Sequence, residues 1–251
     1  MDEFEWFMDA FHQLTGIDLT QYKRPQMERR LTNLRDRRGF HDFPSYIREL
    51  GVRRELLDEL LDKMTINVSE FFRNPERWEQ LGQLLQNRKQ PIKAWSAACS
   101  TGEEPYSLAM LLDYLGIKHD TILATDIDER VLAKAAQGNY DSMQLRGTDR
   151  SYRDKYFDVD GTKFQVKKQI RDQVEYRKHN LLSDSYPSGM DLIICRNVLI
   201  YFTDDTKQSI LDKFTLSLRV GGLLFVGSTE QFFGLNLPHL KLVAPFTYEK
   251  Q

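Results

Sequence analysis

The residues from Trp95 to Tyr106 constrain the fold of this chain most, because they join a strand pattern to a helix pattern through one tight turn. The run 92–98 contains mainly apolar and small residues, which predicts a short buried strand. After Gly102, acidic residues and Pro105 stand where they favour the start of a helix. A strand, a turn and a helix form the first half of a βαβ unit, so we expect a ligand at the carboxyl end of this strand.

The composition of this turn favours a cationic or neutral ligand over a phosphate. A phosphate-binding turn carries several glycines, often with a lysine, and has no acid at the start of its helix. Here Glu103 and Glu104 occupy that position. The next predicted strand, 121–125, is followed by Asp126, whose carboxylate can bind the two ribose hydroxyls of a nucleoside. The sequence therefore predicts S-adenosylmethionine rather than NAD, with Glu104 on the amino group of its methionine part.

The second part of the chain predicts a doubly wound α/β domain. Strands are expected near 92–98, 121–125, 174–178, 190–195 and 222–227, with one further antiparallel strand over 241–248. Asn180 and Leu181 follow the third of these strands, where an amide and an apolar side chain suit an adenine ring. The interval of about 139–173 is too long for a simple crossover, and Asp160-Gly161 between two β-prone runs predicts a hairpin. We therefore expect a small antiparallel β insert in this interval.

Residues 1–75 are predicted to form an all-helical N-terminal domain, followed by a linking helix over 76–90 and a cofactor-binding domain over 91–251. Apolar residues at helical spacing predict helices near 4–14, 25–38, 43–50 and 54–64. The second of these helices has a basic face, formed with the residues just before it by Lys23, Arg24, Arg29, Arg30, Arg35, Arg37 and Arg38. Such a face is either solvated surface or a docking site for an acidic partner.

Composition and charge argue against several other classes of protein. The net charge of −2 gives no general attraction to nucleic acid or membranes. No apolar run approaches the roughly 20 residues needed to span a bilayer, and the acidic N-terminus is unlike a signal peptide. Two cysteines cannot form a disulfide framework, so we expect a cytoplasmic protein. The histidines are scattered without ligand spacing, and we expect no metal site.

Several segments, in their order and spacing, resemble the CheR family, the methyltransferases that methylate glutamates of bacterial chemoreceptors. The matching segments are Asn67–Arg73 (Asn-Val-Ser-Glu-Phe-Phe-Arg), Trp95–Tyr106, Ala124–Asp128, Asn180–Leu182 and Cys195–Phe202 (Cys-Arg-Asn-Val-Leu-Ile-Tyr-Phe). Ser69 is a departure, because relatives often carry threonine there, although the hydroxyl is retained. The resemblance spans most of the chain and implies a class I, Rossmann-like methyltransferase. Such an enzyme converts glutamate carboxylates to methyl esters and leaves S-adenosylhomocysteine as the second product.

The resemblance also implies roles for single residues. The segment before the cofactor domain would fold over the site, with Asn67, Ser69 and Arg73 directed into it. Asn197 and Val198 would contact the cofactor. Arg73, together with Tyr201 of the Cys195–Phe202 segment, would orient the substrate carboxylate.

Two surfaces would contact the receptor under this resemblance. The basic helix would dock on the cytoplasmic signalling domains of chemoreceptors through Arg29, Arg30, Arg35, Arg37 and Arg38. The insert would be a receptor-contact module, and in some family members such a sheet captures the receptor's C-terminal tail by strand addition. Neither surface predicts a nucleic-acid partner or insertion into a membrane.

Two other functions remain open from the sequence. One is an S-adenosylmethionine-dependent methyltransferase of RNA or small molecules, whose basic helix would bind phosphate. The other is a non-catalytic S-adenosylmethionine-binding regulator. Mild alkali cleaves methyl esters but not N- or C-methyl groups, so the base lability of a transferred methyl label separates the first alternative. A protein that binds cofactor without transferring methyl groups would correspond to the second.

Overall fold

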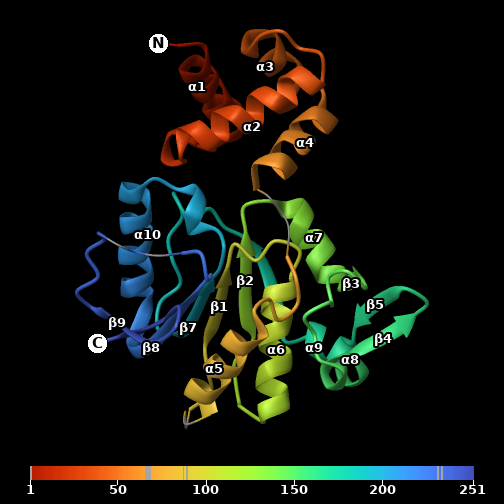
Figure 1. Ribbon diagram of the computed structural model, residues 1–251, viewed down its shortest axis with the longest axis vertical. Coiled ribbons are helices and arrows are strands. Elements are labelled where there is room, and N and C mark those ends of the chain that lie inside the picture. The colour runs from red at the N-terminus through yellow and green to blue at the C-terminus, as the bar shows by residue number, and fades with distance from the viewer. Residues whose placement is uncertain (1, 66–68, 87, 89, 231, 233) are drawn as a thin grey trace. The chain divides into compact units, whose positions relative to one another are not determined.

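The computed structural model describes residues 2–65, 69–86, 88, 90–230, 232 and 234–251 (Figure 1). The chain divides into two compact units, one formed by Met1–Val68 with Tyr201–Thr206 and the other by Ser69–Ile200 with Lys207–Gln251. We call them the helical unit and the sheet unit. Within the described ranges, none of the helices combines the length and the apolar character that crossing a membrane requires.

The helical unit is built around aromatic side chains. Its elements are α1 (Glu3–Thr15), η1 (Leu19–Gln21), α2 (Arg24–Arg37), α3 (Phe43–Val52) and α4 (Arg54–Thr65). Helix α1 begins at the Asp2 cap, and its C-cap is Gly16 with φ 75°. Its buried phenylalanines include Phe7, whose ring centroid lies 4.5 Å from that of Phe43 on α3. Apolar spacing thus predicts the phenylalanines of α1 as its buried face, whereas Leu14 at the end of the predicted apolar run is 39% exposed.

The sheet unit contains the main sheet and a small second sheet. Its helices are α5 (Pro75–Gln86), α6 (Glu103–Leu115), α7 (Glu129–Gln137), α8 (Arg150–Tyr156) and α9 (Lys168–Arg171). It also contains most of the short η2 (Leu199–Tyr201) and of α10 (Asp204–Ser217), whose residues 201 and 204–206 belong to the helical unit. The main sheet consists of β1 (Ala94–Ala97), β2 (Ile122–Asp126), β6 (Val174–Lys178), β7 (Met190–Cys195), β8 (Leu218–Val226), β9 (Leu240–Ala244) and β10 (Thr247–Lys250). Helices flank this sheet, and the small sheet lies beside α8 and α9 (Figure 1).

The strand order of the main sheet confirms the predicted doubly wound domain. The order is β6-β2-β1-β7-β8-β10-β9, and the pairs β6–β2, β2–β1, β1–β7 and β7–β8 are parallel. Strand β1 is therefore central and is buried along its whole length. Because the order reverses on either side of β1, the carboxyl ends of β1, β2 and β7 form the edge where such sheets bind ligands.

The prediction of one final strand over 241–248 is wrong, because the chain reverses within that range. Strands β9 and β10 form an antiparallel pair, and β10 also pairs antiparallel with β8. The reversal falls at Pro245 and Phe246. Proline has no N–H to donate to a ladder, and Phe246 adopts φ 60°. The sheet thus gains one strand more than the sequence suggested.

The insert is antiparallel, as predicted, and it has a third strand besides the predicted hairpin. It contains β3 (Asn139–Asp141), β4 (Phe157–Asp160) and β5 (Lys163–Val166) in the order β3-β5-β4. Gly161 in the β4–β5 turn has φ 58°, which accounts for the glycine in the Asp-Gly signal. The insert also shares the main core of the sheet unit, to which it contributes Leu145, Tyr156, Phe157, Val166 and Ile170. It is therefore joined to the rest of the sheet unit by buried side chains.

Candidate active site

The turn between β1 and α6 is held in an unusual backbone conformation. Ala98 has φ 59° and Ser100 has φ 50°, in a region that residues other than glycine rarely adopt. Gly102 has φ 93°, and a Cβ atom there would lie 2.7 Å from both Ala135 Cβ and Tyr176 Oη. Only glycine fits at that position. Strained backbone of this kind is concentrated at binding and catalytic sites, where the surrounding structure holds it in place.

Asp126, at the end of β2, is fixed by backbone donors of this turn. Its Oδ2 accepts the Ser100 N–H at 2.9 Å, and its Oδ1 accepts the Asp128 N–H at 3.0 Å. Burial raises the pKa of Asp126, while these two hydrogen bonds oppose that rise. Each carboxylate oxygen has a second lone pair. Asp126 can therefore accept ribose hydroxyls and still hold the turn.

Glu104 on α6 is the acid of the turn that is best suited to bind a cation. Its side chain is only partly accessible, and it accepts a hydrogen bond from Ser96 Oγ at 2.7 Å. Burial raises the pKa of Glu104 to about 7, against the opposing effect of the nearby Arg196 guanidinium. A carboxyl group that is costly to ionise gains when a ligand brings a positive charge to it. An ammonium group supplies that charge.

The neighbouring Glu103 has a different role, which sequence reasoning did not separate from that of Glu104. It is fully buried and accepts hydrogen bonds from Thr101 Oγ1 at 2.7 Å and from Gln144 Nε2 at 2.6 Å. Burial raises the pKa of Glu103. The hydrogen bonds from Thr101 and Gln144, and a further one from the Ser69 side chain, oppose this rise. Glu103 therefore joins the turn to the insert and to the segment that carries Arg73.

Arg73 lies in a segment that Arg196 holds by its backbone. Arg196 Nη2 donates to the Arg73 carbonyl at 2.7 Å and to Asn74 Oδ1 at 3.0 Å. The buried guanidinium of Arg196 lies 4.9 Å from the ring centroid of Phe225. The residues on either side of Arg73 have φ 49° (Phe72) and 60° (Asn74). The backbone of the predicted substrate-orienting residue is thus fixed by Arg196, to which the sequence analysis assigned no role.

The residues after β7 form a second strained loop. Asn197 has φ 63°, and its Nδ2 lies 3.3 Å from Thr229 Oγ1. A Cβ atom on Gly227 would lie 2.7 Å from Asn197 N, so the loop packs directly on the end of β8. The N–H of Val198 is bound by Glu230, a buried acid that sequence reasoning also missed. Its position just after β8 was the available signal, since the same reasoning identified Asp126 after β2.

The remaining predicted residues fall in several places. Asn180 and Leu181 follow β6, where Asn180 Oδ1 accepts the Leu182 N–H at 2.9 Å and Leu181 is buried. Tyr201 belongs to the helical unit, in which its carbonyl accepts the Lys23 N–H at 2.8 Å. Asn67 lies outside the described residues. Ser69, Arg73, Glu104, Asp126, Asn197 and Val198 all lie in the sheet unit. The binding and orienting roles of these residues and of Tyr201 stay predictions.

The polar groups at this edge of the sheet fit S-adenosylmethionine. It offers one carboxyl group for an ammonium, a second for a ribose diol, and a turn that has acids where a phosphate site has glycines and a lysine. In the part of the chain that the structure describes, no three His, Cys, Asp or Glu side chains are grouped so that they could hold a metal ion. Both cysteines, Cys99 and Cys195, are buried and free.

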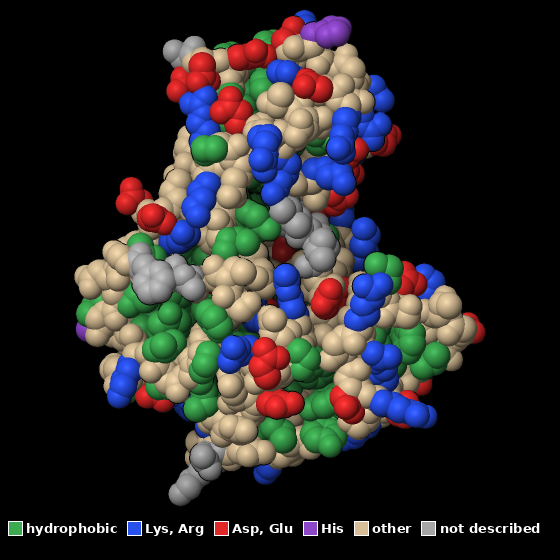
Figure 2. Space-filling model, viewed as in Figure 1, with side chains coloured by type: hydrophobic (Ala, Val, Ile, Leu, Met, Phe, Trp, Pro, Cys, Tyr) green, Lys and Arg blue, Asp and Glu red, His purple; other side chains and the backbone are tan. Residues whose placement is uncertain are grey.

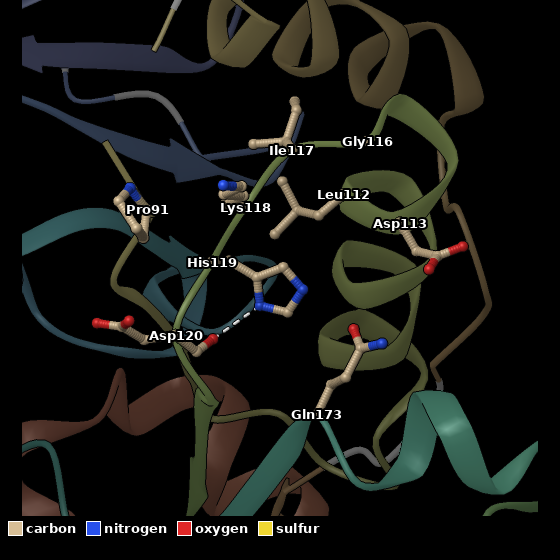
Figure 3. Close-up of a pocket in the computed structure, with 9 residues that line it drawn as sticks. All are labelled: Pro91, Leu112, Asp113, Gly116, Ile117, Lys118, His119, Asp120 and Gln173. Atoms are coloured by element: carbon tan, nitrogen blue, oxygen red, sulfur yellow. Dashed lines mark hydrogen bonds between the residues drawn. The ribbon is translucent and has the colours of Figure 1, made fainter. Parts of the chain in front are cut away.

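A hollow of about 540 Å³ lies elsewhere on the sheet unit (Figure 3). Its lining residues are Pro91, Leu112, Asp113, Gly116, Ile117, Lys118, His119, Asp120 and Gln173. These residues lie before β1, in the last turn of α6, between α6 and β2, and before β6, so the hollow is at the amino ends of the strands. The His119 ring is directed toward it, with Nδ1 held 2.7 Å from the Asp120 carbonyl (Figure 3). It is therefore separate from the edge that carries the strained turns.

Comparison with known families matches both parts of the chain. Residues 67–244 match the family described as CheR methyltransferase, SAM binding domain, and residues 2–65 match CheR methyltransferase, all-alpha domain. A solved structure of similar fold is the N-methyltransferase NodS from Bradyrhizobium japonicum in complex with S-adenosyl-L-homocysteine. It is 16% identical, has a TM-score of 0.38, and covers 61% of this chain and 60% of its own.

Curated relatives extend over nearly the whole chain. A chemotaxis protein methyltransferase of Listeria monocytogenes serovar 1/2a is 40% identical over 235 residues, which cover 91% of this chain and 90% of that protein. The proteins of the same name from Borreliella burgdorferi and Escherichia coli are 33% and 34% identical, and cover 99% and 93% of this chain and 94% and 85% of their own. The chain therefore belongs to the CheR family of S-adenosylmethionine-dependent chemotaxis methyltransferases.

Proposed function

We propose that this enzyme transfers a methyl group from S-adenosylmethionine to glutamate side chains on the cytoplasmic signalling domains of chemoreceptors. The observation that carries the proposal is the edge of the sheet where Glu104 and Asp126 lie beside the strained turn after β1 and Arg196 fixes the backbone of Arg73. Two of these groups suit the cofactor, and Arg73 suits a carboxylate substrate. Relatives named chemotaxis protein methyltransferases support the assignment to receptors.

The chemistry needs positioning more than acid–base catalysis. A glutamate side chain has a pKa of about 4.3 and is already a carboxylate at neutral pH. S-adenosylmethionine, when bound, supplies a methyl group activated by its sulfonium centre. The protein has to align the carboxylate oxygen with that group and remove water from between them. Arg73 is the proposed orienting group, because a guanidinium matches a carboxylate in geometry and charge.

The strength of this arginine contact is limited by the reaction itself. A carboxylate held by two strong hydrogen bonds is a poorer nucleophile than one held by a single bond. Arg196 donates to the backbone carbonyl of Arg73 and not to its side chain. It therefore fixes the point from which the side chain extends, and the guanidinium at the far end can still adjust. Tyr201 would share the orienting role, and Asn180 with Leu181 would bind the adenine. These assignments follow from the position of the residues in the family's motifs.

The proposed docking surface on α2 is smaller than the sequence suggested. Lys and Arg side chains gather over the helical unit on the face shown in Figure 2. Of the five predicted docking arginines, Arg35 pairs with acids on α1 and α2, and its side chain is only 13% exposed. Arg38 pairs with an acid on α4 at 2.6 Å, and Arg30 donates to a carbonyl of α4 at 3.0 Å. These three arginines help to hold the helical unit together.

Arg29 and Arg37 are the strongest candidates for contact with an acidic receptor helix. Both are exposed, and neither forms an ion pair within the described part of the chain. Reversing both to glutamate should raise the KM for receptor and leave the affinity for S-adenosylhomocysteine unchanged. The matched control reverses Arg48 and Lys63, which are exposed on α3 and α4 of the same unit and form no ion pair among the described residues. Equal effects of the two pairs would show that net charge, not a docking surface, is responsible.

The finer proposal for the insert is capture of a receptor tail by strand addition. Strand β4 is an edge of the small sheet, and Val159 on it is 59% exposed. An edge of this kind offers backbone hydrogen bonds to an extended peptide, and tethering would raise the local receptor concentration. Val159→Asp should weaken binding of a receptor tail peptide in fluorescence anisotropy. Val220→Asp, at a strand position of the main sheet that is 74% exposed, is the control.

The direct test of the function is transfer of a labelled methyl group to receptor-containing membranes. The expected product is a label on receptor that mild alkali releases, because the bond formed is an ester. Label that resists alkali would indicate N- or C-methylation and would contradict the proposal. Label on RNA instead of protein would contradict it as well. Cofactor binding without transfer to any receptor would indicate a regulator.

A further inference from the structure

Glu230 is a buried carboxylate that binds several backbone N–H groups of the same site. It follows β8 and is 3% exposed. Its Oε1 accepts the N–H groups of Val198 at 2.8 Å and Leu199 at 2.7 Å, and its Oε2 accepts the N–H of Gly227. Burial raises the pKa of Glu230, and the backbone donors around it, including that of Asn197, lower it. This carboxylate thus accepts hydrogen bonds from the backbone of the loop after β7.

The loop that Glu230 binds is one that would not hold its shape alone. Asn197 has φ 63°, so the chain leaves β7 in a left-handed conformation. Val198 and Leu199 then direct their N–H groups to one side, where a carboxylate oxygen receives both of them. Gly227 allows the close approach, since a Cβ there would lie 2.8 Å from Asn197 Nδ2 and 2.9 Å from Glu230 Oε2. Buried donors of this kind are costly if left without an acceptor.

We propose that Glu230 is a positioning residue for the cofactor, which sets the Asn197–Val198 loop in its binding conformation. The inference rests on the proposed cofactor contacts of those two residues. Glu230 itself does not touch the cofactor in this scheme, because both of its oxygens are directed to backbone N–H groups. It acts on the ligand by fixing the loop.

A purely structural role would make Glu230 a buried acid that stabilises the fold and nothing more. A buried acid at the opposite end of β7, Asp191, can serve as a control for such a purely structural role. Asp191 is 2% exposed, its Oδ2 accepts the Lys93 N–H at 2.9 Å, and its other oxygen pairs with Arg219. Asp191→Asn should therefore lower stability without reaching the cofactor. Comparing the two isosteric variants separates positioning from stability.

The experiment measures the affinity for S-adenosylhomocysteine by calorimetry, beside thermal melting, for the full-length protein and its variants. Glu230→Gln keeps the size of the side chain but presents an NH2 group to backbone donors. It should weaken binding about tenfold, equivalent to about 1.4 kcal/mol, and raise the KM for S-adenosylmethionine more than that for receptor. Asp191→Asn should melt at a lower temperature and bind within twofold of the parent. Glu230→Gln with a lowered melting temperature and unchanged affinity would overturn the proposal.

A second variant keeps the test decisive if Glu230→Gln does not fold. Gly227→Ala retains the carboxylate and pushes a methyl group toward Asn197 N, so it should displace the loop and weaken binding to a similar extent. Unchanged affinity in this variant would also contradict the proposal. These readouts need no receptor, so failure of receptor methylation in the parent protein would disprove the proposed function and leave the result on Glu230 standing.

Discussion

Replacing Glu104 by glutamine should stabilise the sheet unit and weaken cofactor binding at the same time. Burial raises the pKa of Glu104 to about 7 from the ordinary value of 4.5. The folded protein therefore binds this proton more tightly than the unfolded chain, and the contribution of Glu104 to stability falls as the pH rises from about 4.5 to 7. A difference of this size corresponds to at most about 3 kcal/mol at pH 8, because Glu104 keeps part of its surface accessible to water.

Glutamine removes this cost, since its amide stays neutral and can still accept the hydrogen bond from Ser96. At pH 8 we expect Glu104→Gln to be more stable than the parent by about 2–3 kcal/mol, and at pH 4.5 the two should be nearly equal. Urea unfolding followed by tryptophan fluorescence measures this difference. Trp78 and Trp95 are both buried in the sheet unit, so their emission reports on its unfolding.

Binding should change in the opposite direction. Loss of the carboxylate removes a charge-assisted hydrogen bond to the amino group of the ligand, which contributes about 1.5–3 kcal/mol. Glu104→Gln should therefore bind S-adenosylhomocysteine about 10- to 100-fold more weakly at pH 8. In the parent, affinity should fall below pH 7 as Glu104 gains its proton, and this fall should be absent in the variant. A variant that loses stability at pH 8, or binds as tightly as the parent, would refute the reasoning.

Three further predictions concern the groups around Glu104. Asp126→Ala should weaken binding of S-adenosylhomocysteine by about 1.5–3 kcal/mol, the range for hydrogen bonds to a charged group, and an unchanged dissociation constant in a folded variant would exclude the ribose contact. Arg73→Ala should melt normally but lose most methyl transfer, with at most a modest loss of cofactor affinity, and near-normal turnover would contradict its orienting role. Gln144→Ala removes the Nε2 donor that Glu103 accepts, so it should lower kcat by disturbing the Arg73 segment, whereas Gln169→Ala, exposed on α9, should leave kcat unchanged in the same assay.

Much of the fold was predictable because local patterns and sheet rules agree. The helix of 103–115 follows from its acidic start and apolar spacing, and the place of the ligand follows from where β1 ends. Asp126 was identified because it follows β2 directly. The final hairpin was missed because the run 241–248 was interpreted as one strand, although Pro245 within it favours an interruption. A single positive φ reverses the chain there, and no periodic pattern signals it.

The parts of the site that could not be predicted depend on contacts between distant segments. Glu103 and Glu104 are adjacent in sequence, but the donors that reach Glu103 come from the β1–α6 turn, the insert and the Arg73 segment. Arg196 finds its acceptors in residues 73 and 74, more than a hundred positions earlier. Glu230 binds a loop about thirty residues before it. Sequence spacing predicts that polar residues gather after the strand ends. Contacts with distant segments then decide which of these residues hold the backbone and which stay available for a ligand.

The contacts between the insert and distant segments decide which experiments on receptor binding can be interpreted. Removing the whole insert would expose a core to which it contributes Tyr156, Phe157 and Ile170. It would also remove Gln144, whose carbonyl accepts the Phe71 N–H at 2.9 Å two residues before Arg73. Such a deletion would damage the active site even if the insert served only to bind receptor. The exposed tip of the β4–β5 hairpin carries little of the core, so only changes confined to that tip can separate receptor capture from methyl transfer.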